Sequence, residues 1–168
     1  MSSVYRGLTL LLVLAGVPTL AVAQPALPAP VVEFTGGYAG FADDATVSHG
    51  MLGSAFRVYV TPRLSVGPEV QYMIGPDTDR DLIVTGNATF DLLPPSRRTT
   101  PFVVAGAGLF RHSQQFAGRT FSSTEGAFTG GGGVRTRISD RVSAAAEVRA
   151  GWELHYRVSG TVAVALGR

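Results

Sequence analysis

Apolar and polar side chains alternate residue by residue along most of the chain after its first 30 residues. The alternation is clearest in residues 64–74, where Val70 and Tyr72 share one parity. Glu69 and Gln71 share the other parity. Successive side chains of a β-strand point to opposite faces, whereas a helix would mix these two sets on one surface. The pattern therefore predicts an all-β protein.

About eight segments of roughly ten residues follow this rule and are predicted as strands. They are residues 31–41, 52–61, 64–74, 82–92, 101–111, 127–138, 142–153 and 156–167. Short turns are predicted at 61–63, 94–99 and 139–141, and longer polar loops at 42–49, 75–80 and 112–125. This asymmetry is typical of an antiparallel up-and-down barrel that crosses an outer membrane. The predicted barrel domain covers residues 31–168, and both its ends fall on the short-turn, periplasmic side.

Charge is confined almost entirely to one of the two strand faces. That face carries Glu33, Arg57, Glu69, Asp91, Arg111, Arg135, Arg137, Glu147, Arg149 and Arg157. The apolar face carries aromatic residues near segment ends, namely Tyr38, Tyr72, Phe90, Phe102, Trp152 and Tyr156. A soluble barrel turns its apolar face inward, whereas an outer-membrane barrel turns it to the lipid, with aromatic girdles at the two interfaces. We predict the second arrangement.

An eight-stranded barrel has an interior just wide enough for side chains to fill, and buried charges are costly unless they are paired. We therefore predict a charge network in the lumen, in which arginines pair two glutamates and block free flow. Its predicted members are Arg57, Glu69, Arg135, Arg137, Glu147 and Arg149.

The N-terminus has the features of a secretory signal, predicted over residues 1–23. Arg6 precedes the apolar run 8–15, and Ala21-Val22-Ala23 provides small residues for cleavage after Ala23. Residues 24–30 are predicted to be a Pro-rich spacer. No later apolar run is long enough to span a bilayer as a helix, so a membrane location would require a closed barrel.

The strand pattern over residues 31–168 resembles the small eight-stranded outer-membrane barrels of the OmpA/OmpX-like kind. The resemblance implies a barrel in the outer membrane of a Gram-negative bacterium. The expected partners are outer-membrane lipids, lipopolysaccharide and the outer-membrane assembly machinery, and the expected state is a monomer. Members of that family often end in an aromatic residue, whereas this chain ends in Leu166-Gly167-Arg168.

Composition narrows the function further. The net charge is +2, and all 14 basic residues are scattered arginines, with no run longer than Arg97-Arg98, so nucleic-acid binding is not expected. The chain has no cysteine, which excludes thiol catalysis and Cys-ligated metals. No cofactor and no metal site are predicted.

Candidate catalytic groups are sparse. Adjacent His112 and Ser113 point to opposite faces of a strand, so they are not expected to act together. The segment 129–134 (TGGGGV) lacks the Lys-Ser/Thr of a phosphate loop, so its glycines are assigned to strand curvature. Clustered histidines at loop ends and the loop carboxylates of Asp77, Asp79 and Asp81 could bind a cation but are expected to be solvated. The preferred function is therefore a non-enzymatic, porin-like barrel with a structural or loop-mediated binding role. The alternatives are a narrow passive pore, a lipid-modifying barrel enzyme and a soluble lipocalin-like carrier.

Overall fold

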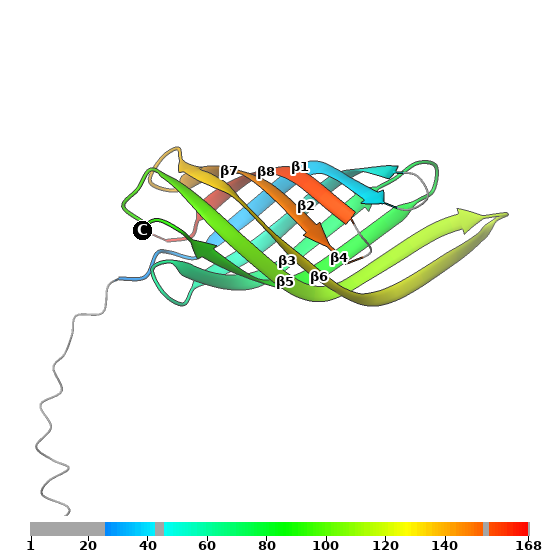
Figure 1. Ribbon diagram of the computed structural model, residues 1–168, viewed down its shortest axis with the longest axis horizontal. Coiled ribbons are helices and arrows are strands. Elements are labelled where there is room, and N and C mark those ends of the chain that lie inside the picture. The colour runs from blue at the N-terminus through cyan, green and yellow to red at the C-terminus, as the bar shows by residue number, and fades with distance from the viewer. Residues whose placement is uncertain (1–25, 43–45, 153–154, 168) are drawn as a thin grey trace, which may run out of the picture.

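A computed structural model describes residues 26–42, 46–152 and 155–167. Each strand pairs antiparallel with the next, and β8 pairs with β1 to close a barrel (Figure 1), which confirms the predicted fold. The strands are β1 (Val31–Ala42), β2 (Thr46–Tyr59), β3 (Leu64–Ile74), β4 (Arg80–Asp91), β5 (Thr99–Phe116), β6 (Arg119–Arg137), β7 (Val142–Gly151) and β8 (His155–Ala165).

The predicted signal segment 1–23 lies outside the described residues. Of the predicted spacer, residues 26–30 are described and have no regular secondary structure. The described part of the chain includes no helix long and apolar enough to cross a membrane.

The inward and outward faces of the barrel differ in polarity. In β4 the inward side chains at 81, 83, 85, 87, 89 and 91 are buried, and all but Ile83 are polar or charged. The outward face carries large apolar side chains in the open, with Leu52 64% and Phe34 60% exposed. This arrangement inverts that of a soluble barrel, in which apolar groups fill the interior.

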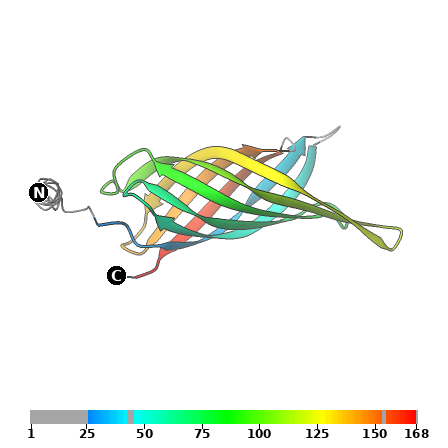
Figure 2. The ribbon, with the colours of Figure 1, turned by 90° about the horizontal axis from the view of Figure 1, so that it is seen from below.

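The two ends of the barrel also differ. The turns 60–63, 92–98 and 138–141 lie at the end of the barrel where β1 begins and β8 ends (Figure 2). There the backbone N–H of Leu166 donates to the carbonyl of Pro30 at 2.7 Å. We call this the turn end and the opposite one the loop end. The prediction of a loop at 42–49 was wrong at its edges, because Phe41 pairs with Val47 and β2 already begins at Thr46.

The predicted loop 112–125 was also wrong, because these residues continue β5 and β6 as a paired hairpin. Its two-residue turn is Ala117-Gly118, with φ of 49° and 74°. Positive φ at both positions is the geometry that matches the twist of the flanking strands. Pairing of β5 with β4 stops at Ser113 and pairing of β6 with β7 begins at Thr129. The hairpin beyond these residues projects from the loop end of the barrel (Figure 2).

Candidate functional site: the barrel lumen and its two mouths

An ion-pair cluster crosses the middle of the lumen. Glu69 on β3 accepts hydrogen bonds from Arg149 Nη1 and Nη2 on β7 at 3.2 and 2.9 Å. It also accepts one from Arg157 Nη2 on β8 at 2.8 Å. Arg149 donates in turn to Glu147, with Nη2 3.0 Å from Oε2. Strands β3 and β7 are four positions apart in either direction around the barrel, so the Glu69–Arg149 pair spans its full diameter.

Two further pairs lie nearer the turn end. Arg57 Nη2 is 2.6 Å from Glu33 Oε1, and Arg57 also donates to Ser65 Oγ at 3.1 Å. Arg135 Nη1 is 2.8 Å from Asp91 Oδ1. These pairs and the central cluster together contain four carboxylates and four guanidinium groups, so the charges of the set cancel.

Five of the six residues of the predicted network take part in buried or partly buried ion pairs in the lumen, but Arg57 and Arg135 have other partners than expected. Arg137 lies apart, because it sits at the turn end and donates to the backbone carbonyl of Pro95. Arg157 has the parity of the polar face but is not among the residues predicted for the network. Arg157 is nevertheless only 1% exposed. Arg111 was assigned to the inward face, but its side chain is exposed near the base of the hairpin.

Phe102 was predicted on the outward aromatic face, but the structure buries it inside the barrel. The segment around it is apolar on both parities, so alternation alone does not fix its direction. The Arg135 guanidinium lies 4.8 Å from the centre of its ring. The facing residue on β6 is Gly133, where a Cβ would come within 2.8 Å of the Phe102 ring. The glycine therefore provides the space for this ring, which fits the assignment of the TGGGGV segment to a strand.

The remaining five aromatic residues predicted for the girdles point outward. Tyr38, Tyr72, Trp152 and Tyr156 lie toward the loop end, with the rings of Tyr38 and Tyr156 6.1 Å apart. Phe90 lies at the turn end, where Arg63 stacks over its ring at 4.7 Å. Phe34, Phe56 and Phe128 also expose their rings on the outward face, but they are not among the residues predicted for the girdles, although each has the parity of the apolar face.

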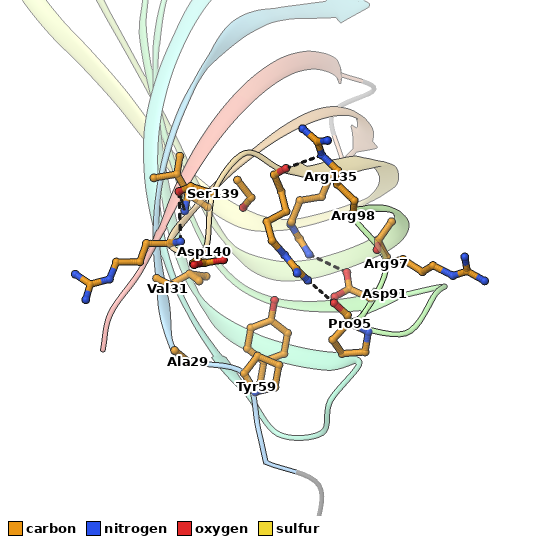
Figure 3. A pocket seen from close by; sticks show the side chains of 18 of the residues that line it. Ala29, Val31, Tyr59, Asp91, Pro95, Arg97, Arg98, Arg135, Ser139 and Asp140 are labelled. Atoms are coloured by element: carbon orange, nitrogen blue, oxygen red, sulfur yellow. Dashed lines mark hydrogen bonds and ion pairs between the residues drawn. The ribbon is translucent and has the colours of Figure 1, made fainter. Parts of the chain in front are cut away.

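The lumen is narrow in the middle and open at its ends. A cavity of about 20 Å³ lies among the ion pairs, which is room for about one water molecule. A cavity of about 460 Å³ opens at the turn end, and Figure 3 shows Arg135 reaching Asp91 beside it. Between the ion pairs and the loop end lies a closely packed apolar layer. It consists of Ala39, Met51, Met73, Ile83, Phe110 and Ala127.

A second cluster of titratable groups lies at the loop-end mouth, beside a cavity of about 900 Å³. His49 Nε2 is 3.0 Å from Asp79 Oδ2 and 3.2 Å from Asp81 Oδ2. His112 Nδ1 is 2.7 Å from Asp81 Oδ1 and 3.4 Å from Asp79 Oδ1. The expectation that these loop-end groups are solvated is wrong for His49 and Asp81, which are each only 2% exposed. The inward parity of His49 was a signal for this cluster, whereas the incorrect inward assignment of Arg111 turned His112 outward in the prediction.

The other candidate catalytic groups do not come together. His112 turns inward to Asp81, whereas no hydrogen bond joins it to Ser113 among the described residues. The third histidine, His155, is buried at the same mouth, with its Nδ1 2.7 Å from the carbonyl of Trp152.

The projecting hairpin is braced at one point by the β3–β4 turn. Thr78 Oγ1 donates to the carbonyl of Gln115 at 3.0 Å and accepts from the Gln115 N–H at 3.1 Å. Residues 119–126 are all exposed, and Phe121 presents 57% of its surface. The edge of β6 that faces away from β5 has no neighbouring strand over residues 119–127 among the described residues.

No model of a protein family matches the sequence. A search of curated proteins finds no match either. Solved structures do match. The N-terminal β-barrel domain of Pseudomonas aeruginosa OprF is 12% identical with a TM-score of 0.70, and the match covers 84% of this chain and 100% of that one. Neisserial surface protein A (NspA) is 14% identical with a TM-score of 0.68, and the match covers 82% of this chain and 97% of that one. Ail, the attachment invasion locus protein of Yersinia pestis, is 10% identical with a TM-score of 0.59, and the match covers 83% of this chain and 98% of that one. The chain therefore has the fold of the small eight-stranded outer-membrane β-barrels.

Proposed function

We propose that the protein is an outer-membrane barrel, closed to free flow, that binds its partner through the projecting β5–β6 hairpin. The observation that carries this proposal is the contrast between the filled lumen and the projecting hairpin. The lumen is filled by cross-strand ion pairs and an apolar layer, whereas residues 114–116 and 119–126 belong to the hairpin that projects from the barrel. An exposed strand edge and the exposed ring of Phe121 are suited to contact with another molecule.

The proposal includes export by a signal peptide cleaved after Ala23, and a monomer embedded in outer-membrane lipid and lipopolysaccharide after insertion by the assembly machinery. The apolar outward surface and its aromatic residues support a lipid environment, because they would be a liability in water. The likeness to OprF and NspA supports the same location. Under this proposal the mature protein begins at Gln24, which intact-mass measurement tests directly.

The three alternatives fit the geometry less well. A passive pore would need a continuous lumen, but the central cavity has a volume of only about 20 Å³. A lipocalin-like carrier would need an apolar interior, but here Arg157 and Glu69 are buried. A lipid-modifying enzyme would need a nucleophile bonded to its base, and among the described residues no side-chain hydroxyl is hydrogen-bonded to His112.

Single-cysteine labelling tests the location and the exposure of the hairpin. The chain has no cysteine of its own, so each introduced one is unique. We expect Ser123→Cys, in the hairpin, to react with a membrane-impermeant maleimide on intact cells. Ser96→Cys, in an exposed turn-end loop, should react only after the cells are opened.

Fractionation and gel mobility provide the control for these variants. Both should be found in the outer-membrane fraction, and unheated samples should migrate faster than boiled ones. Equal labelling of both positions on intact cells would refute the orientation. Recovery of the protein in the soluble fraction without detergent would refute the membrane location.

A further inference from the structure

We propose that His49, Asp79, Asp81 and His112 form a binding site for one divalent transition-metal ion at the loop-end mouth, with Zn²⁺ as the best match. The four side chains come from β2, the β3–β4 turn, β4 and β5. His49 and Asp79, 30 positions apart, and Asp81 and His112, 31 positions apart, are thus brought together by the curvature of the sheet.

The spacing of the four groups suits direct coordination. One ligand atom each from His49, Asp79 and Asp81 lie within 4.8 Å of one another. The closest nitrogen–oxygen separations are 2.7, 3.0, 3.2 and 3.4 Å. Zinc bonds of roughly 2.0–2.2 Å in a tetrahedron place neighbouring ligands about 3.3–3.5 Å apart. Only small side-chain movements would bring His49, Asp79 and Asp81 to that geometry, and His112, whose Nδ1 already contacts both carboxylates, would complete the set.

The charge of the cluster also favours a bound cation. Every carboxylate of the central lumen set is paired with an arginine. By contrast, among the described residues Asp79 and Asp81 form no ion pair with an arginine, and the side chains that contact them are imidazoles. Asp81 is only 2% exposed. Two carboxylates in contact repel each other in a poorly solvated site, and a divalent ion held by neutral imidazoles would cancel both charges.

The surroundings hold the ligands in place. Phe41 packs edge-on against the His49 ring, with centroids 4.9 Å apart. The β3–β4 turn passes directly over the cluster at Gly75, where a Cβ would lie 2.4 Å from His49 Nε2. The Oδ1 atom of Asp79 is buried and makes no hydrogen bond in the described structure. An oxygen in that condition remains available to a metal ion.

The mixture of ligand types selects the class of metal. Imidazole nitrogen suits zinc and its neighbours in the first transition row, whereas calcium and magnesium prefer sites made of oxygen ligands. Two imidazoles and two carboxylates therefore favour Zn²⁺ over the alkaline-earth ions that associate with lipopolysaccharide.

Metal titration of the purified full chain in detergent, after treatment with a chelator, tests the site. We expect one Zn²⁺ per chain by calorimetry, no displacement by an excess of Ca²⁺, and a Zn²⁺-dependent rise in the temperature at which the compact gel band is lost. Asp81→Asn and His49→Gln should each weaken Zn²⁺ binding about tenfold or more. Asp77→Asn is the matched control, because Asp77 lies exposed in the same turn and outside the cluster.

Absence of stoichiometric Zn²⁺ binding would overturn the proposal, as would equal weakening by Asp77→Asn and Asp81→Asn. Displacement of Zn²⁺ by Ca²⁺ at similar concentration would also overturn it. If the buried substitutions prevent folding, His112→Ala decides the question, because that side chain is 38% exposed and its loss spares the barrel. Unchanged Zn²⁺ affinity in folded His112→Ala would exclude it as a ligand and reject the four-residue site.

Discussion

At the scale of single residues, the charges in the lumen are the most demanding feature of the protein. Glu69 is buried and meets two guanidinium groups, those of Arg149 and Arg157. Removing water from an ion costs several kcal/mol in a protein interior, and close geometry with further hydrogen bonds is needed to offset it. Each member of the cluster is therefore tolerated only in the presence of the others.

We expect Glu69→Ala to lower the free energy of unfolding by about 3–5 kcal/mol, because two arginines then lose a buried partner. Urea unfolding in detergent, followed by the fluorescence of the single tryptophan, Trp152, measures the change. Glu125→Ala removes an exposed carboxylate and should alter stability by no more than about 0.5 kcal/mol. Equal effects of the two substitutions would argue against a structural role for the cluster.

The sequence predicts the direction of these side chains but not their partners. Alternation places Glu69, Glu147 and Arg149 on one face of their strands. Which residues meet across the lumen depends on the tilt and stagger of the strands, and the hydrophobic pattern does not specify these. For that reason Arg157 was not assigned to the network. Phe102 was misassigned because its strand is apolar on both faces.

At the scale of secondary-structure elements, the β5–β6 hairpin departs most from expectation. Its arms carry polar residues on both faces, as in HSQQF, and therefore lack the alternation that identifies a half-buried strand. Its turn, Ala117-Gly118, also lacks the Asn-Gly or Asp-Gly pair that signals a tight hairpin. By contrast, β3 and β4 were predicted well because one face of each is lined by lumen groups.

The turn of the hairpin can be improved by one substitution. Ala117 has a φ of 49°, a region that Asn tolerates far better than Ala. We expect Ala117→Asn to slow amide hydrogen exchange in residues 119–125 severalfold without changing exchange in the barrel strands. Exchange measured by NMR tests this, and unchanged rates in the hairpin would mean that its turn does not limit opening.

At the scale of the whole molecule, two barriers lie in series along the barrel axis. The ion pairs close the lumen at its middle, and the layer around Met73 and Ile83 closes it again toward the loop end. Two mouths with larger cavities are thus kept apart.

We expect the wild-type barrel to show no discrete conductance steps in planar bilayers. Glu69→Ala should also be silent, because the apolar layer remains. The triple variant Glu69→Ala, Met73→Ala, Ile83→Ala should pass small ions, provided that gel mobility shows it to be folded. Conductance in the wild type, or a silent folded triple variant, would contradict this arrangement of barriers.

The cross-lumen pair also has a consequence for the order of folding. Glu69 and Arg149 are 80 residues apart and lie on opposite walls, so their contact needs the complete circle of strands. The charges remain in water until β1 meets β8, and that pairing removes them from water all at once. Closure of the sheet and dehydration of its interior are therefore one cooperative event, with few stable states between an open sheet and a sealed barrel.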